Sequence, residues 1–337
     1  MRPYFITTPI FYINAAPHIG HLYTVLLADA RHRWELLKNP TSPTIFSVGT
    51  DEHGAKVSNA AEKACMPVEQ FCTGMADKYK QLFSAFDVNY SRFVRTTDDG
   101  HIAAVQHLWK QLRSGGFIYE DVYKGWYCTA DEAFYTEKEI TTKTNSDGKP
   151  QKIAPSGHPV DWVEERNYLF RLSKLRQELV QWLSSDVIEP WNYRQMMLNV
   201  ALRCDRDISV SRDSQRVDWG VPVPGDPSQK VYVWLDALVN YLTVAGYPDN
   251  LTLWPPDLHI IGKDILKFHS VYWPAFLMAA GLELPKKILC HSHWTVDHVK
   301  MSKSLGNVVD PWAQLHKFTK DGFRYFLIRH PVYHRDA

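Results

Sequence analysis

The sequence predicts an α/β protein built on a doubly wound parallel sheet that is split by an α+β insertion. Short apolar, β-branched runs alternate with longer segments of helical periodicity, which is typical of parallel sheets covered by helices. At Gly115-Gly116 the chain becomes short-stranded and polar. The alternating pattern returns in the last third of the chain. These observations predict two halves of one sheet with an inserted unit between them.

The first half of the predicted sheet begins with an aromatic and β-branched strand over Tyr4–Ile13. The segment Asn14-Ala15-Ala16-Pro17 breaks this strand, and apolar residues with helical spacing then predict a helix over Gly20–Lys38. A second strand is expected at Thr44–Val48. The same periodicity predicts further helices over Ala55–Ala64, Val68–Phe86 and 102–113.

Residues 115–215 are predicted to form the insertion, with a polar surface loop at 141–149. The later elements are expected as strands at Val231–Leu235 and Leu258–Ile261, a helix over Ile265–Ala280 and a strand at Ile288–Trp294. We therefore assign 1–114 and 216–295 to the two halves of the sheet and 296–337 to a C-terminal segment. A ligand should bind at the carboxyl ends of the strands, where a doubly wound sheet opens a crevice.

Composition restricts the class of protein. A chain of 337 residues with 45% hydrophobic residues is globular and large enough for two domains, or for one with an insertion. Its net charge of +1 gives no bulk argument for nucleic-acid binding, so such a ligand would need a local basic surface. Five cysteines without a CxxC pair fit a reducing compartment. No apolar run reaches the length of a membrane span, so no membrane partner is expected.

The segment His18-Ile19-Gly20-His21 lies at the predicted strand-to-helix turn. Helix N-termini attract phosphate through their unpaired N–H groups and the helix dipole. His18 and His21 would add donors, and Gly20 would let a flat adenine approach the backbone. Taken alone, the segment also fits two surface histidines that flank a packed Ile-Gly pair.

The segment Lys300-Met301-Ser302-Lys303-Ser304 lies in a predicted loop near the end of the chain. Lysines on such a loop can move onto a polyphosphate and stabilise the charge that builds as pyrophosphate leaves. Lys303 is the expected mobile transition-state contact. A short basic loop is otherwise often only solvated. Because the chain has neither a P-loop nor a GxGxxG motif, kinase, GTPase and dinucleotide-binding functions lose their main support.

These two segments, in this order, resemble the class I aminoacyl-tRNA synthetases, and further segments resemble the methionyl-tRNA synthetase family. The resemblance extends from about Tyr4 to Arg329, and 291–296 and 234–241 are most similar to the animal mitochondrial form. It implies a Rossmann-like catalytic domain, with the Lys-Met-Ser-Lys-Ser loop and the start of a stem-contact segment in 296–337. The further segments are Thr8–Asn14, Gly49–Gly54, Tyr232–Ala237, Gly262–Ile265 and Leu305–Pro311.

The resemblance implies a methionine–tRNA ligase, which uses ATP to convert methionine to methionyl-adenylate and then transfers it to the acceptor end of tRNA(Met). Asp51 would take the methionine ammonium group, and Tyr241 or His269 would also read its sulfur. Asp264 would lie near the ribose hydroxyls. The implied methionine-binding residues are Pro9, Ile10, Tyr12, Asp51, Trp234, Ala237, Tyr241 and His269. The implied ATP-binding residues are His18, Gly20, His21, Gly262, Asp264, Lys300, Met301, Ser302 and Lys303, of which His18, His21, Lys300 and Lys303 are the expected catalytic residues.

The resemblance also implies Mg²⁺ on the ATP phosphates, although no dedicated metal cage is visible in the sequence. Zinc is not expected, because Cys128, Asp131 and His158 give at best a three-ligand remnant of a four-ligand site. A monomer in the mitochondrial matrix is expected. The N-terminus shows no transit peptide, since Arg2-Pro3 lead directly into the first strand, and a cytoplasmic location is the alternative.

The sequence leaves several functions open. Family members continue past Arg324-Tyr325-Phe326 into an anticodon-binding domain, so this domain is expected to be absent from the chain. The chain would then be a core that only activates methionine, or one that binds without charging tRNA. The sequence is also compatible with a class I synthetase for another apolar amino acid, a stand-alone nucleotidyltransferase or a structural RNA-binding module. The intact set His18, His21, Asp51, Lys300 and Lys303 favours catalysis.

Overall fold

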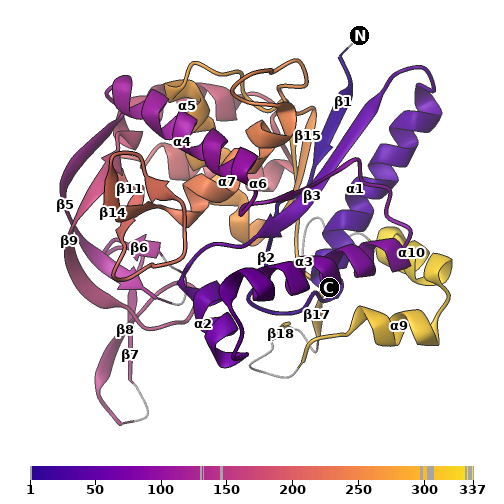
Figure 1. Cartoon of the computed structure of the whole chain (residues 1–337), viewed down its shortest axis with the longest axis horizontal. Helices are drawn as coiled ribbons and strands as arrows, with labels where there is room; N and C mark the ends of the chain where they lie inside the picture. The colour runs from indigo at the N-terminus through magenta and orange to yellow at the C-terminus, as the bar shows by residue number, and fades with distance from the viewer. Residues whose placement is uncertain are drawn as a thin grey trace.

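The centre of the molecule is a seven-stranded parallel sheet with helices on both faces, shown in a computed structural model (Figure 1). The structure describes residues 2–129, 131, 133–144, 147–296, 299–301, 307–330, 332 and 336. The sheet has the order β10-β16-β15-β1-β3, and both β2 and β4 pair with β3. Its strands are β1 (Tyr4–Thr7), β2 (Phe11–Tyr12), β3 (Thr44–Asp51), β4 (Arg92–Arg95), β10 (Ile188–Glu189), β15 (Leu258–Gly262) and β16 (Ile288–His291).

Every pairing in this sheet is parallel, so the carboxyl ends of its strands lie along one edge. The predicted doubly wound α/β fold is confirmed. β1 lies between β3 and β15, and the chain therefore runs outward from β1 in both directions. This is the switch point at which ligands bind in open α/β sheets.

The two faces of the sheet belong to two separate apolar cores. Adjacent residues of a strand point to opposite faces, and Phe5 accordingly packs into one core while Ile6 packs into the other. Ile260 and Ile261 on β15 divide in the same way. Because both faces are buried, these strands are mostly apolar, and their buried polar residues Thr7 and His259 are hydrogen-bonded to each other.

Helices from both halves of the chain cover the sheet. α1 contacts β1, β3 and β15 on one face, and α4 packs against α7 on the other. Among the described helices, none is long and apolar enough to cross a lipid bilayer. The helices of this region are α1 (Ile19–Lys38), α2 (Ala55–Lys63), α3 (Val68–Ala85), α4 (Asp99–Ser114), α7 (Val233–Ala245) and α8 (Trp273–Ala279).

Residues 118–213 form a second unit around an antiparallel sheet of order β11-β9-β5-β6. The hairpin β7–β8 projects from it at the lower left of Figure 1. The range also supplies β10, which pairs with β16 and so extends the main sheet. Its elements are β5 (Ile118–Cys128), β6 (Ala133–Tyr135), β7 (Thr141–Thr144), β8 (Pro150–Ile153), β9 (Asp161–Phe170), α5 (Arg176–Ser184), α6 (Trp191–Ala201), β11 (Ile208–Ser209) and β12 (Ser211–Asp213).

The predicted strand at Val231–Leu235 is wrong beyond its first residue. β14 (Asp226–Val231) pairs with β12 and β13 (Pro222–Val223) and ends at Val231, and α7 begins at Val233. Most of α7 is buried, and residues 231–235 form an unbroken apolar run, so the start of the helix resembles a buried strand in a periodicity analysis. The predicted strand Tyr4–Ile13 is likewise two strands, interrupted around Pro9, which has no N–H to donate to a sheet.

The predicted helix over Ile265–Ala280 is divided into three short pieces. A 3₁₀ turn at Lys263–Ile265 is followed by a π-helical turn at Phe268–Tyr272 and then by α8. The π turn lies directly before Pro274, which cannot donate a helical hydrogen bond. It carries His269, one of the predicted methionine-binding residues.

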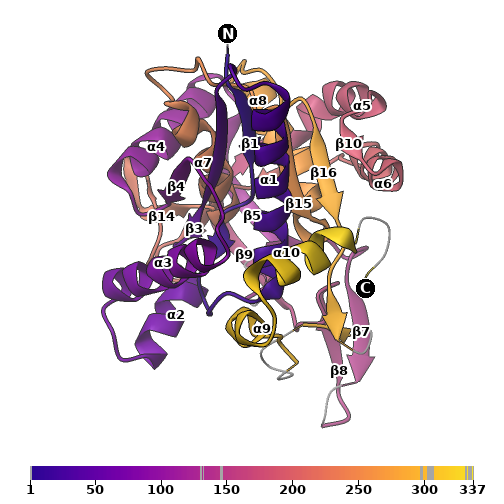
Figure 2. The same cartoon turned by 90° about the vertical axis from the view of Figure 1, so that its right-hand side faces the viewer.

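The C-terminal segment packs against the start of the chain. The predicted strand Ile288–Trp294 ends at His291, and β17 (Thr295–Val296) then pairs with β18 (Val299–Lys300). α9 (Pro311–Lys317) and α10 (Lys320–Arg329) follow, and α10 lies against α1, as Figure 2 shows. Arg324 of α10 is ion-paired with the fully buried Asp29 of α1.

Candidate active site

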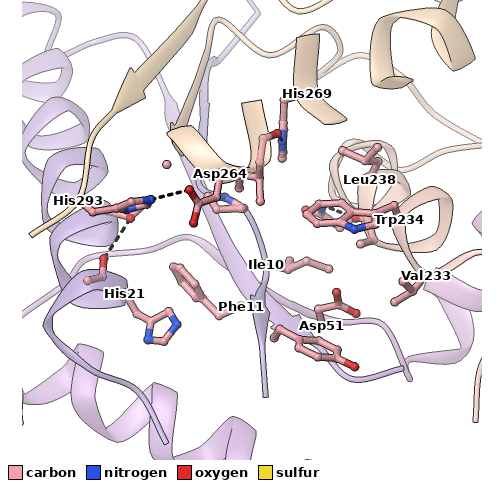
Figure 3. A pocket seen from close by; sticks show the side chains of 18 of the residues that line it. Ile10, Phe11, His21, Asp51, Val233, Trp234, Leu238, Asp264, His269 and His293 are labelled. Atoms are coloured by element: carbon pink, nitrogen blue, oxygen red, sulfur yellow. Dashed lines mark hydrogen bonds and ion pairs between the residues drawn. The ribbon is translucent and has the colours of Figure 1, made fainter. Parts of the chain in front are cut away.

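A cavity of about 360 Å³ lies at the carboxyl edge of the parallel sheet (Figure 3). Its walls come from the residues that follow β1, β3, β15 and β16, from the N-terminus of α1 and from α7. Fourteen of the residues predicted from the sequence line it: Pro9, Ile10, Tyr12, His18, Gly20, His21, Asp51, Trp234, Ala237, Tyr241, Gly262, Asp264, His269 and Met301. Lys300 is described only as part of β18, and Ser302 and Lys303 lie outside the described residues.

The N-terminus of α1 is capped by histidines. The Gly20 N–H donates to His18 Nδ1 at 3.0 Å, and the His18 N–H donates to His21 Nδ1 at 3.1 Å. This is a reciprocal capping box in which imidazoles take the places of the usual hydroxyl and carboxyl groups. The two rings lie with their centroids 3.9 Å apart.

These hydrogen bonds determine the tautomer of both rings. An Nδ1 atom that accepts a backbone N–H carries no hydrogen, so a neutral imidazole must carry its hydrogen on Nε2. Both rings therefore present Nε2–H donors, and the first turn of α1 contains no acidic side chain. A helix N-terminus with two added donors and no acidic residue in its first turn favours a phosphate ligand.

Gly20 is required by the cap itself. A Cβ at this position would lie 2.8 Å from His18 Cε1 and 3.0 Å from its Nδ1, so the ring would have to leave its capping position. This geometric reason adds to the predicted approach of adenine to the backbone.

We expect Gly20→Ala to reduce ATP-dependent activity roughly 10- to 100-fold with little net change in stability. The lost cap costs about 1 kcal/mol, and alanine in place of glycine in a helix returns a similar amount. Thermal unfolding and steady-state kinetics measure the two effects. Gly74→Ala is the matched control, because nothing lies within 4 Å of a Cβ there, so it should stabilise α3 without changing activity. Full activity in Gly20→Ala would contradict the role of the cap.

The opposite end of the cavity is aromatic and carries Asp51. Figure 3 shows His21, His293 and Asp264 toward one end, and Asp51, Trp234 and Val233 toward the other. Trp234 stacks on Phe268 with the ring centroids 3.7 Å apart and 7° between the planes. This stack gives the wall a flat apolar face, to which an unbranched thioether side chain is suited.

Tyr241 and His269, which both line the cavity, form a hydrogen-bonded pair. His269 Nδ1 lies 2.9 Å from the Ile265 carbonyl oxygen, which can only accept, so Nδ1 carries the hydrogen. Burial lowers the pKa of His269 to about 4, so the ring is neutral and its bare Nε2 accepts the Tyr241 hydroxyl hydrogen at 2.6 Å. The His269 ring is thus held by the Ile265 carbonyl oxygen, and the Tyr241 hydroxyl hydrogen is directed to His269, which orients the Tyr241 hydroxyl oxygen.

Several cavity residues were missed by the sequence predictions. His293 and Trp294 follow β16 at the same edge as the predicted residues, so the rule about carboxyl ends could have found them. His293 Nε2 lies 2.9 Å from Asp264 Oδ1, and His291 Nε2 lies 2.9 Å from Thr24 Oγ1. The missed residues are Phe11, Thr24, Lys56, Asp131, Val233, Leu238, Asn240, Ile265, His291, His293 and Trp294.

Asp131 shows that the inserted unit reaches the cavity. The sequence pattern associated Asp131 only with Cys128 and His158, as a remnant of a metal site. In the structure Asp131 accepts hydrogen bonds from the hydroxyls of Tyr135, at 2.8 Å, and Ser156. Among the described residues, no three His, Cys, Asp or Glu side chains are grouped so that they could hold a metal ion.

The buried histidines of the site make stability depend on pH. Burial lowers the pKa of both His269 and His291 to about 4. As pH falls, the two histidines take up protons near pH 6.5 in the unfolded chain but only near pH 4 in the folded protein. The stability that the neutral rings contribute is therefore complete above pH 6.5 and is lost as pH falls toward 4. We expect His291→Gln to reduce the stability lost between pH 7.5 and pH 5 by about 2 kcal/mol. Urea unfolding at both pH values measures this, and an unchanged pH dependence in the variant would contradict it.

Comparison with known proteins agrees with this geometry. Residues 4–337 match the model of the family described as tRNA synthetases class I (M). The chain is 52% identical to the mitochondrial methionine–tRNA ligase of Homo sapiens, covering 98% of this chain and 57% of that protein. It is 49% identical to the mitochondrial methionine–tRNA ligase of Xenopus laevis, covering 100% of this chain and 60% of that protein. The chain thus spans somewhat over half the length of these relatives.

Solved structures give the same result. A Mycobacterium tuberculosis methionyl-tRNA synthetase in complex with methionyl-adenylate superposes with a TM-score of 0.92 at 42% identity. That match covers 100% of this chain and 66% of the other. The apo form of the Mycobacterium tuberculosis enzyme gives a TM-score of 0.82 at 38% identity, with coverage of 100% and 63%. The sequence motifs, the doubly wound sheet and these matches together place this chain in the methionyl-tRNA synthetase family of class I tRNA synthetases.

Proposed function

We propose that this chain activates methionine with ATP and transfers it to tRNA(Met). The methionine carboxylate would attack the α-phosphate of ATP in line, giving methionyl-adenylate and pyrophosphate. The adenylate would then pass the methionyl group to the ribose at the 3′ end of the tRNA. One observation carries the proposal: a single cavity joins a histidine-capped helix N-terminus at one end to a carboxylate and an aromatic wall at the other.

The phosphate end supports catalysis by positioning and charge stabilisation. No side-chain nucleophile is needed, because the attacking carboxylate belongs to the substrate. The Nε2–H groups of His18 and His21, together with the dipole of α1, favour the negative charge that develops on the phosphates. Lys300 and Lys303 are proposed to complete this stabilisation from the other side of the ATP.

The methionine end supports selection by shape. Asp51 is proposed to bind the ammonium group, and Trp234, Ala237, Tyr241 and His269 to enclose the side chain. Because the Tyr241 hydrogen is directed to His269, the hydroxyl oxygen is held in one orientation beside the thioether. An apolar pocket separates side chains that differ by one methylene by only about 1–3 kcal/mol, so a fixed polar group should add discrimination.

Partners and location follow from the relatives. The mitochondrial relatives support a location in the mitochondrion, which we propose to be the matrix, and their names as methionine–tRNA ligases support tRNA(Met) as the acceptor. We also propose that the chain is a monomer. Mg²⁺ is proposed only as a companion of the ATP phosphates. The described residues form no cluster that would hold it, so no step is assigned to it.

ATP–pyrophosphate exchange on the purified chain, with each amino acid in turn, tests the activation step. We expect exchange with methionine and little with leucine, isoleucine or valine. Exchange that depends on another apolar amino acid would contradict the proposed specificity for methionine. No exchange with any amino acid from a folded sample would contradict the proposed activation of methionine. Charging of tRNA(Met) by the same sample then tests the second step, and exchange without charging would restrict the function to activation.

A further inference from the structure

A buried carboxylate joins three elements directly behind the cavity. Asp236, in the first turn of α7, is 1% exposed and lies between two imidazoles. Its Oδ2 is 2.7 Å from His53 Nδ1, and its Oδ1 is 2.9 Å from His101 Nε2. His53 follows the end of β3, and His101 lies in the first turn of α4, so α7, β3 and α4 meet at one side chain. We refer to Asp236, His53 and His101 as the clamp.

The clamp is held by charge as well as by geometry. Burial alone would raise the pKa of Asp236, but the two imidazoles lower it to about 2 through the charge of His53 and hydrogen bonds from both rings. The carboxylate is therefore ionised at neutral pH, and the nitrogen atoms that face it both carry hydrogens. Removing such a charge from a buried pair is costly, because the partner groups lose the charge that compensates them.

Each histidine is fixed on its far side. His101 Nδ1 lies 2.9 Å from Thr243 Oγ1, so His101 contacts α7 at two points that are seven residues apart. The His53 ring packs edge-on against Trp219 with the centroids 5.5 Å apart, and the Trp219 indole N–H donates to the Glu52 carbonyl oxygen at 2.6 Å. His101 therefore joins α4 to α7 through both of its ring nitrogens, and His53 joins the end of β3 to α7 while its other side packs against Trp219.

The clamp connects the two parts of the methionine end without lining it. Asp51 precedes His53 by two residues, and Trp234, Ala237 and Tyr241 are on the same helix as Asp236. The described lining of the cavity includes these four residues but none of the three clamp residues. The phosphate end, in contrast, is built on α1, β15 and β16, whereas the hydrogen bonds of the clamp given above join β3, α4 and α7.

We propose that Asp236 is a positioning residue that fixes the distance between the ammonium-binding carboxylate of Asp51 and the side-chain wall of α7. The inference rests on the proposed function, because it assigns these two groups to one amino acid. A shift of α7 by about 1 Å would weaken simultaneous contact with both ends of methionine roughly 10- to 100-fold. ATP binding would change little.

The test compares Asp236→Asn with the intact chain in pyrophosphate exchange. We expect the KM for methionine to rise roughly 10- to 100-fold and the KM for ATP to stay within about twofold. The preference for methionine over ethionine, which is longer by one methylene, should also fall. His101→Gln keeps the carboxylate paired with His53 and should raise the KM for methionine by a smaller factor. If the Asp236→Asn variant does not fold, the KM for methionine of the His101→Gln variant tests the proposal instead.

Asp29→Asn is the matched control. Asp29 is also fully buried and ion-paired, with Arg33 and Arg324, but it lies far along α1 from the capped end. It should lower Tm while leaving the KM for methionine unchanged. The inference alone would be overturned if the wild-type chain is active but the folded clamp variants keep the wild-type KM for methionine. It would also be overturned if those variants raise the KM values for methionine and ATP equally. A wild-type chain without exchange would overturn the proposed function and this inference with it.

Discussion

Asp51→Asn is expected to weaken methionine binding about 100-fold. A carboxylate that pairs with an ammonium group in a partly closed site contributes through both charge and hydrogen bonding, and the loss of one charged partner costs about 2–5 kcal/mol. Asp51 is the last residue of β3 and lines the cavity next to the apolar wall. We therefore expect no other group to replace its charge in the variant. Equilibrium titration of the folded variant with methionine measures the effect directly.

A methionine analogue without its amino group is the control for this prediction. The wild-type chain should bind methionine far more tightly than the analogue, whereas Asp51→Asn should bind the two almost equally. If the variant keeps the full preference for methionine, the ammonium group is bound elsewhere and the proposed orientation of the substrate is wrong.

His18→Asn is expected to reduce pyrophosphate exchange roughly 100- to 1,000-fold while keeping the stability of the chain. Asparagine is a preferred N-cap, and its carbonyl oxygen can replace Nδ1 as the acceptor of the Gly20 N–H. It has no group at the position of Nε2–H, which is the proposed phosphate donor. Thermal unfolding and exchange kinetics on the same sample separate these two roles.

His18→Ala provides the comparison for the cap. It should lose activity as His18→Asn does and should also lose about 1 kcal/mol of stability, because alanine cannot accept the backbone hydrogen bond. Wild-type exchange in a well-folded His18→Asn variant would show that the ring serves only as a helix cap.

Much of the fold could be predicted because its local signals agree. The helix over Gly20–Lys38 and that over Ala55–Ala64 appear within a residue of the predicted bounds, since each has a clear apolar face and a clear break before it. The signal failed where elements are buried on all sides. The start of α7 was assigned to a strand because residues 231–235 form an unbroken apolar run. The 3₁₀ and π turns before α8 leave no periodic pattern in the sequence.

The cavity residues were predictable where a motif or a strand end marks them, as for His21 and Asp51. Their partners were not, because those contacts join positions far apart in the sequence. Asp131 reaches the cavity from the inserted unit, and Thr24 meets His291 across 267 positions. The pairing of Asp236 with His53 and His101 depends on the packing of α7 against β3 and α4, which periodicity does not specify.

The most direct test of the proposed site is a crystal structure of the chain with a stable methionyl-adenylate analogue. We expect the methionine side chain against Trp234 and Tyr241, the ammonium group at Asp51, and the phosphate group beside Nε2 of His18 and His21. An analogue bound outside this cavity, or bound with its amino acid at the capped end of α1, would contradict the proposed site.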